Sequence, residues 1–436
     1  MTTDLLLDDN DVMTLDNPVA DDMEDLISVK EVEDAIARLK GPRVLQVLPA
    51  LGNGGVERGT LDISRYLIDR SWSPIVVSNG GEQERDLFEM GAVSINLPVH
   101  TKNPLLMHAN IKRLVNLIRE HDIQLVHARS RAPAWSAHYA AKRSGVPFLT
   151  TFHSLYSGSE NFLKRGYNAI MTGGNRVIAI SDYVAEHISQ HYGVGADRLR
   201  VIPRGVDLQA FDPEKVEKAR VDALIDKWQL DRNKRIVMLP ARVTQRKGHT
   251  WLLKSLKKLW EQGKADDVIC IMVGGRTAKG GYANKVEKMI IDLQLEHRVW
   301  LVGDCNDMPA AYTLSDVVVV PSVGPEAFGR TSIEAQAMGK PVIATDRWGL
   351  SETIMPAATG WLVQPDDTDD LSNALDLALA MPDDARERLV GRARRFVDRH
   401  YSVQRMGKST LAVYRELIEG RKPLPSLLPD TPFEGT

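Results

Sequence analysis

From Arg43 onward, short runs of β-branched and aliphatic residues alternate with longer amphipathic stretches. The runs that predict strands in the first half are 44–48, 74–78, 93–97, 124–127, 148–152, 176–180 and 200–203. Helical periodicity fills the intervals, for example at 55–70 and 105–120. Alternation of this kind is typical of a parallel sheet that is covered by helices on both faces.

The same pattern begins again after a linker near residues 205–212. Its strand-like runs are 235–239, 268–273, 299–302, 317–320, 342–344 and 361–363. Three helical stretches follow, at 367–380, 383–399 and 402–419. We therefore expect an α/β protein with two doubly wound, Rossmann-like domains around one cleft, because ligands of such sheets bind outside the carboxyl ends of the strands.

A chain of 436 residues is long enough for two domains with separate cores. The expected parts are an N-terminal extension (1–40), a first domain (41–205), a second domain (206–400) and a tail (421–436). Residues 1–25 contain nine Asp or Glu and no Lys or Arg, and we expect them to be disordered. The rest of the chain then carries a charge of about +6.

Composition otherwise changes this picture little. No apolar run approaches the roughly 20 residues of a membrane span, and the start of the chain lacks a basic-then-apolar signal pattern. The two cysteines, Cys270 and Cys305, lie in or just after apolar runs, which favours buried thiols over a disulfide or a metal site. We expect a cytoplasmic protein with no nucleic-acid partner.

The most informative run covers residues 324–339. It places Glu326 in a predicted loop and Glu334 one turn into a predicted helix, so that both carboxylates can face one cleft. The backbone N–H groups of residues 328–330 would lie at the helix N-terminus, which stabilises an anion. Carboxylates beside an anion site suit a ligand with both hydroxyls and phosphates, such as a nucleotide sugar.

Two loops that follow the first strand of each half support this interpretation. Gly54 and Gly55 open a predicted helix, where glycines allow close approach of a ligand, although a tight strand-to-helix turn is the alternative. Arg242 and Lys247 follow the first strand of the second half and could converge on one diphosphate. Solvated loop bases are the alternative for this pair.

Taken in order, these motifs resemble those of the retaining glycosyltransferases of family 4, which have the GT-B fold. The Glu-x7-Glu spacing of Glu326 and Glu334 and the Gly-Gly-x-Glu-Arg run from Gly54 carry the resemblance, which covers about residues 43–420. It implies that the last helix, 402–420, crosses back onto the first domain. One departure is Trp-Gly-Leu-Ser-Glu at 348–352, where the family often has Gly-Gly-x-x-Glu; it leaves the local loop shape open.

The resemblance implies a role for each donor-side motif. The residues that it places around the donor are Gly54, Gly55, Arg242, Lys247, Val302, Gly303, Glu326, Phe328, Gly329 and Glu334. Val302 and Gly303 would face the nucleobase, and Glu334 would bind the ribose hydroxyls. Glu326 would contact the sugar and diphosphate together with the N–H groups of Phe328 and Gly329, as a binding residue and not as a nucleophile.

Charge on the leaving diphosphate must be stabilised as the glycosidic bond breaks. Arg242, Lys247 and helix N-termini can supply this stabilisation. The sequence has no Asp-x-Asp at a strand end and no His/Cys cluster with metal-ligand spacing. We therefore expect a metal-independent reaction without a cofactor.

Two histidines end consecutive strands of the first half. His153 lies in a Thr-Phe-His run that resembles the family segment near the sugar and acceptor, and it is the first-domain candidate for catalysis. His127 would lie behind it or contact the acceptor, although a histidine at a strand end is more often structural. Arg129 and Arg131 are candidates for binding an anionic acceptor, and the loop 154–168 is rich in residues that suit sugar hydroxyls.

The segment 102–115 mixes apolar residues with a cationic edge. One interpretation is a helix packed on the sheet with solvated bases. The other is contact of Lys102, Lys112 and Arg113 with an anionic membrane, at the inner face of the plasma membrane. The acceptor would be a glycan or glycolipid, with synthesis of surface polysaccharide or lipopolysaccharide core implied by the family.

The sequence thus predicts a retaining hexosyltransferase that uses a nucleotide-diphosphate sugar, with UDP, GDP and ADP donors all open. One alternative is a GT-B nucleotide-sugar epimerase, and another is a catalytically silent, membrane-associated sugar-nucleotide sensor. A dinucleotide-dependent dehydrogenase is disfavoured, because residues 52–55 do not form Gly-x-Gly-x-x-Gly.

Overall fold

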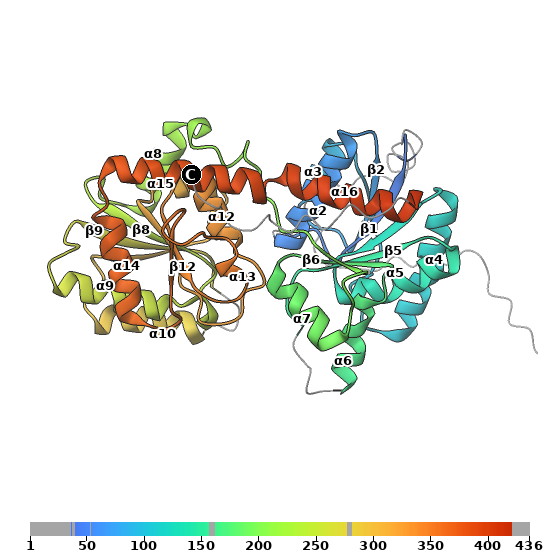
Figure 1. Ribbon diagram of the computed structural model, residues 1–436, viewed down its shortest axis with the longest axis horizontal. Helices are drawn as coiled ribbons and strands as arrows, with labels where there is room; N and C mark the ends of the chain where they lie inside the picture. The colour runs from blue at the N-terminus through green and yellow to red at the C-terminus, as the bar shows by residue number, and fades with distance from the viewer. Residues whose placement is uncertain (1–35, 37–39, 53, 157–161, 277–280, 421–436) are drawn as a thin grey trace, which may run out of the picture.

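A computed structural model describes residues 36, 40–52, 54–156, 162–276 and 281–420. The acidic segment 1–25 and the tail 421–436 lie outside the described residues. The described chain forms two α/β domains that lie side by side (Figure 1). No helix among the described residues is both long and apolar enough to span a membrane.

The first domain has a seven-stranded parallel sheet with the order β3-β2-β1-β4-β5-β6-β7. Its strands are β1 (Arg43–Val47), β2 (Ser73–Ser78), β3 (Val93–Asn96), β4 (Leu125–Ala128), β5 (Phe148–Phe152), β6 (Arg176–Ala179) and β7 (Leu199–Val201). Helices α4 (Pro104–Glu120), α5 (Arg131–Ser144) and α7 (Asp182–Tyr192) pack on one face, and α2 (Gly55–Ile68) and α3 (Glu84–Glu89) on the other. Two short elements, α6 (Phe162–Ala169) and the 3₁₀ helix η1 (Ile170–Thr172), precede β6.

The second domain has a six-stranded parallel sheet with the order β10-β9-β8-β11-β12-β13. Its strands are β8 (Arg235–Pro240), β9 (Val268–Val273), β10 (Val299–Gly303), β11 (Val317–Val320), β12 (Val342–Thr345) and β13 (Trp361–Val363). One face is covered by α9 (His249–Glu261), α10 (Gly281–Asp292) and α14 (Thr368–Leu379). The other is covered by α8 (Lys218–Trp228), α11 (Met308–Leu314), α12 (Arg330–Ala337) and α13 (Trp348–Ser351), and the 3₁₀ helices η2 (Pro213–Lys215) and η3 (Gln245–Lys247) lie in loops. The predicted α/β class with two doubly wound parallel sheets is confirmed.

The strand order positions the site. In the first sheet the order reverses between β1 and β4, and in the second between β8 and β11. Ligands of doubly wound sheets bind at such reversals, outside the carboxyl ends of the strands. The loops at these reversals are residues 48–54, 129–130, 241–248 and 321–329. They contain Gly54, Arg242 and Glu326, while Lys247 lies in η3, and Gly55 and Glu334 lie in the helices that follow, α2 and α12.

The last two helices of the described residues join the domains. Helix α15 (Asp383–Tyr401) lies on the second domain, and α16 (Val403–Glu419) continues across to pack on α2 of the first (Figure 1). A Cβ at Gly407 would overlap the Tyr66 ring, so α16 approaches α2 closely only with glycine at this position. The buried Glu416 carboxylate accepts hydrogen bonds from Arg176 Nε (2.7 Å) and Arg200 Nη2 (3.0 Å). The C-terminal helix is therefore part of the first domain's core.

Across residues 40–420, outside the gaps given above, the chain crosses between the domains twice, and the two connecting segments lie beside each other. Val206 donates its N–H to the carbonyl of Tyr401 at 2.7 Å, and Val403 donates to the carbonyl of Val206 at 3.1 Å. A parallel bridge between Val206 and Ser402 results. The two segments that connect the domains are therefore hydrogen-bonded to each other.

Candidate functional site

The loop after β8 lies against the loop after β11. Gly248 has a φ of +72°, in the left-handed region that favours glycine, and a Cβ there would overlap the carbonyl oxygen of Pro321. This close approach brings the end of η3 beside the Glu-x7-Glu motif. Lys247 Nζ lies 2.7 Å from Glu326 Oε1 as a result.

Glu326 is the centre of a cationic cluster. Its side chain is 9% exposed, and Oε1 also lies 3.0 Å from Arg246 Nη1 and accepts a 3.0 Å hydrogen bond from Ser322 Oγ. Arg242, predicted to share the diphosphate with Lys247, is exposed and forms no ion pair within the described part of the chain. Arg246, which the sequence argument did not select, is the arginine that reaches Glu326. Arg242 and Arg246 lie in the same loop, and only the contact with Glu326 in the folded protein separates Arg246 from Arg242.

Glu334 lies in α12 with both carboxylate oxygens engaged. Arg330 Nε donates to Oε1 at 2.7 Å, and the Tyr312 hydroxyl donates to Oε2 at 3.2 Å. Burial, and then the Glu334 charge, raise the pKa of Tyr312 well above its usual value of 10, so this hydroxyl stays a hydrogen-bond donor. The carboxylate is therefore held in one orientation.

Residues 348–352, which form α13 and its C-cap Glu352, pack beneath this motif. Trp348 adopts a left-handed φ of +60°, a conformation that costs a residue other than glycine about 1–2 kcal/mol. Gly349 donates its N–H to the Glu326 carbonyl at 3.0 Å, and a Cβ at Gly349 would overlap the Ala327 carbonyl. Helix α13 thus supports the backbone of the motif, although the segment lacks the first glycine of the family pattern.

The motif loop also contacts the first domain. Ser181 Oγ donates to the Ala327 carbonyl at 2.7 Å. The Phe328 ring lies 5.6 Å from the Tyr401 ring, in a hydrophobic core shared by both domains. A Cβ on Gly329 would lie 2.7 Å from Thr353 Oγ1, so only glycine fits before α12. Contacts with both domains therefore hold the loop in place.

Val302 and Gly303, which were predicted to contact the nucleobase, lie at the end of β10, an edge strand of the second sheet. Gly303 has a φ of +75°, and its carbonyl accepts a 2.7 Å hydrogen bond from Gly274 N. The register of β10 against β9 shifts between Leu301 and Gly303, and the Val302 side chain packs towards the core. Val302 and Gly303 therefore present backbone at the carboxyl end of the strand.

On the first-domain side, α2 begins at Gly55 after Gly54, which provides no side-chain cap. Arg204, in the loop after β7, is 7% exposed and donates through Nη2 to the Gly55 carbonyl. A Cβ on Gly59 would lie 2.7 Å from Arg204 Nη2, so Gly59 makes room for this guanidinium. No motif in the sequence marked Arg204, because it is isolated from the other site residues along the chain.

The two histidines have different surroundings. His153 Nδ1 lies 3.1 Å from Arg204 Nη1, while its buried Nε2 has no partner. Burial, followed by the charges of Arg204 and Arg129, lowers the pKa of His153 well below 6.5, so the ring is neutral. His127 is 1% exposed and uses both ring nitrogens, at 2.7 Å to Tyr414 Oη and 2.7 Å to Thr151 Oγ1. The structure thus places His127 in the core beneath α16.

Arg129 and Arg131, the two arginines predicted to bind the acceptor, have different hydrogen-bond partners. Arg129 is buried and donates Nε to Gln46 Oε1 at 3.0 Å. Arg131 donates to Asn168 Oδ1 at 2.9 Å, and its guanidinium carbon lies 4.4 Å from the centre of the Tyr156 ring. Arg131 is therefore directed towards the region of the predicted sugar-binding loop.

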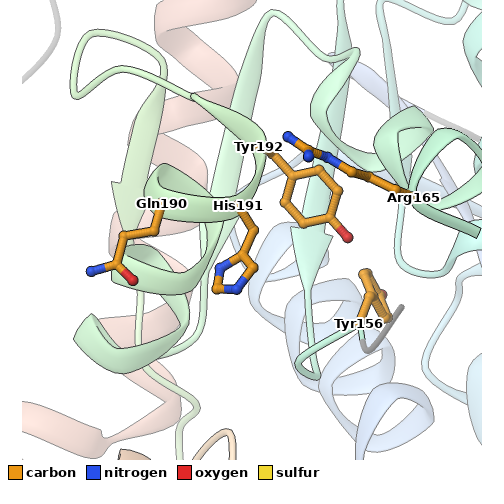
Figure 2. A pocket seen from close by; sticks show the side chains of 5 residues that line it. All are labelled: Tyr156, Arg165, Gln190, His191 and Tyr192. Carbon is orange, nitrogen blue, oxygen red and sulfur yellow. The ribbon is translucent and has the colours of Figure 1, made fainter. Parts of the chain in front are cut away.

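A pocket of about 120 Å³ opens beside this loop (Figure 2). The side chains that line it are Tyr156, Arg165, Gln190, His191 and Tyr192. Residues 157–161 of the predicted loop lie outside the described residues. The pocket belongs entirely to the first domain and offers hydroxyl, imidazole and guanidinium groups.

Comparisons with known proteins agree with the two-domain fold. A family model for Glycosyltransferase Family 4 matches residues 53–210, and a model for glycosyl transferases group 1 matches residues 221–396. A crystal structure of a glycosyltransferase from Rickettsia africae is 34% identical, with a TM-score of 0.80 over 87% of this chain and 99% of that chain.

Two further relatives are more distant. A D-inositol 3-phosphate glycosyltransferase of Pseudarthrobacter chlorophenolicus is 27% identical over 72% of this chain and 77% of its own. Anabaena Alr3699/HepE, solved in complex with UDP and glucose, has a TM-score of 0.73 and 21% identity, over 86% of this chain and 100% of its own. The latter likeness concerns the fold.

Proposed function

The chain belongs to the family 4 glycosyltransferases with the GT-B fold, and we propose that it is a retaining, metal-independent hexosyltransferase. Its donor would be a nucleotide-diphosphate sugar, and its acceptor a glycan or glycolipid of surface polysaccharide or lipopolysaccharide core. The observation that carries the proposal is the contact between Lys247 and Glu326 at the strand-order reversal of the second sheet.

Lys247 has a chemical role in this proposal. The departing diphosphate gains charge as the glycosidic bond breaks, and an ammonium group stabilises that charge most when water is excluded. Glu326 holds Lys247 in place, and Arg246 adds a second cation on the same carboxylate. The acceptor hydroxyl would attack from the face that the diphosphate leaves and pass its proton to the departing phosphate.

Glu334 would bind the ribose of the donor. A carboxylate has about four lone-pair sites. Arg330 and Tyr312 each occupy one of these sites and fix the group in position. The remaining capacity can accept hydrogen bonds from two ribose hydroxyls. Neutral His153, with a free buried nitrogen, would contact a hydroxyl of the transferred sugar.

The membrane part of the proposal concerns the start of α4. Ile111, Leu114 and Ile118 on this helix are buried, so its middle packs on the sheet. Its first turn exposes Leu105, which is 81% exposed, and the basic residues Lys102, Lys112 and Arg113 are exposed as well. Apolar and cationic groups together suit the interface of an anionic bilayer. We place a peripheral contact with the inner face of the plasma membrane here.

A thermal-shift screen against UDP-, GDP- and ADP-sugars in EDTA tests the donor part, with UDP-glucose first because Alr3699/HepE was solved with UDP and glucose. A sugar nucleotide should raise the melting temperature and be hydrolysed slowly. NMR of the released sugar should first show the anomer of the donor. Appearance of the opposite anomer would exclude retention, and activity that returns only with Mn²⁺ or Mg²⁺ would exclude the metal-independent reaction.

A further inference from the structure

Helix α15 carries a row of arginines on its solvent side. Arg388, Arg392, Arg395 and Arg399 follow one another at intervals of four, three and four residues, and all four are exposed. At about 3.6 residues per turn, these intervals place the four side chains on one side of the helix, along about 17 Å of its length. The helix packs on α12 and lies on the outside of the second domain (Figure 1). We call this row the arginine stripe.

Charges among the described residues neutralise the stripe only in part. Arg392 and Arg395 form no ion pair there, and Arg392 Nε donates to the neutral carbonyl of Ala358 at 2.9 Å. Arg388 pairs with Asp384 at 2.9 Å, but the two side chains are 62% and 70% exposed. An ion pair that is exposed to this extent is weak. The stripe therefore presents net positive charge to solvent.

The other two arginines of α15 have a structural role. Arg386 donates to the carbonyls of Asp316 (3.0 Å) and Ala378 (3.1 Å), and Arg394 donates to Asp212 Oδ1 at 3.3 Å. Both side chains are half-buried, and they hold α15 against the rest of the second domain. Packing of the helix thus accounts for these two arginines, but it does not account for arginine at positions 392 and 395.

A segment of the same chain has the opposite charge. Residues 1–25 contain nine Asp or Glu and no Lys or Arg, and they lie outside the described residues. Ile36, the first described residue, packs against the core of the first domain. The 35 residues before it span up to about 120 Å when fully extended, whereas a compact protein of this size is about 60 Å across. Residues 1–25 are therefore long enough to reach α15.

Carboxylates match the stripe better than they match the other cationic surface, at Lys102, Lys112 and Arg113. Arg113 Nη1 already donates to Asn110 Oδ1 at 3.2 Å, and a lysine offers only a point charge. A guanidinium group offers a planar fork that binds both oxygens of a carboxylate. Several such groups in a row, facing several carboxylates on one flexible segment, strengthen the attraction by multivalency.

We propose that the acidic segment 1–25 binds the arginine stripe of α15. Because Ile36 belongs to the first domain and α15 to the second, the bound segment forms a further link between the domains, in addition to the connection at Val206 and Ser402. Attraction between exposed charges carries this link, so it weakens as the ionic strength rises. The inference does not depend on the proposed transferase activity.

Zero-length cross-linking of the full chain tests the contact. Arg392→Lys and Arg395→Lys, made separately, keep the charge and provide an amine that a carbodiimide couples to a touching carboxylate. At low salt we expect peptides in which the new amine is joined to Asp or Glu of residues 1–25. Most of these links should be lost in about 1 M NaCl, where the Debye length is about 3 Å. Lys254, exposed on α9 at the other face of the second sheet, is the internal control and should give few links.

Removal of the charge gives a second readout. A bound segment is protected from a protease that cleaves beside acidic residues. Arg392→Gln with Arg395→Gln should therefore raise the cleavage rate within residues 1–25 at low salt about three- to tenfold, because the unbound population grows. Lys254→Gln, the matched control, should leave this rate unchanged, and the melting temperatures of all variants should agree.

Four outcomes would overturn the inference. Links from residues 1–25 that go mainly to Lys112 would assign the segment to the first domain. Links from the introduced lysines to Asp430 or Glu434 would assign the stripe to the C-terminal tail. Links found only between isotope-labelled and unlabelled chains would assign it to a second copy. Absence of links at low salt, together with equal cleavage rates in wild type and the double variant, would show that the stripe does not bind the segment.

Discussion

Glu352 couples the two domains and makes their contact sensitive to pH. It follows α13 of the second domain, and its carboxylate accepts hydrogen bonds from the backbone N–H groups of Asp182 (2.9 Å) and Tyr183 (2.7 Å). These groups open α7 of the first domain, so one carboxylate caps a helix across the junction. Burial raises the pKa of Glu352 from its usual 4.5 to about 7, against the opposing effect of the two N–H donors.

The size and sign of the effect follow from this shift. A rise of about 2.5 pKa units corresponds to about 3 kcal/mol in the free energy of unfolding. The folded state holds this proton more tightly than the unfolded state. The contribution is therefore fully present below pH 4.5 and is lost as the pH rises through about 7.

Glu352→Gln isolates this group, because glutamine keeps an acceptor oxygen and does not titrate. Urea unfolding of both proteins between pH 4.5 and about 8 gives the difference in their free energies of unfolding. Wild type minus variant should fall by about 3 kcal/mol across this range. A difference that stays constant with pH would refute the raised pKa. A difference that rises with pH would show that the helix N-terminus outweighs burial.

Three further results are expected. Lys247→Ala should lower turnover about 10- to 150-fold with little loss of stability, while Lys254→Ala keeps wild-type turnover; equal rates would exclude the diphosphate role. Glu416→Gln should lower the free energy of unfolding in urea by about 3 kcal/mol, because two arginines lose a buried counter-charge; an unchanged midpoint would contradict this. Lys112→Glu with Arg113→Glu should release the protein from anionic vesicles in co-sedimentation, and unchanged binding would favour a helix that only packs on the sheet.

Elements with strong local patterns were predicted closely. The expected strands 148–152 and 268–273 coincide with β5 and β9, because β-branched and apolar residues fill a doubly buried strand and turn residues bound it. Where no turn residue marks the end of a strand, the predicted and observed bounds differ by a residue or more. The strand predicted at 200–203, for example, is β7 at Leu199–Val201. Here the following Pro203 and Arg204 continue into the interdomain connection.

The site was harder to predict where partners are distant in sequence. His127 bonds to Tyr414, which lies 287 residues further along the chain, and no local pattern indicates that pairing. Arg204 reaches Gly55 although β4, β5 and β6 separate β7 from β1 in the sheet, because the chain after β7 runs back towards the start of α2. Glu326 and Lys247 were easier to select, since glycines beside each mark loops that pack closely.

The crossing helix α16 has a consequence for synthesis on the ribosome. The first domain emerges first, yet its core cluster with Tyr66 and Ile63 is completed by Leu411 and Tyr414 near the end of the described chain. Domains generally fold as units while translation proceeds. The first domain must therefore wait, with that face uncovered, until the entire second domain has been made. Nascent chains halted before residue 403 should accordingly be more sensitive to protease in the first domain than in the second.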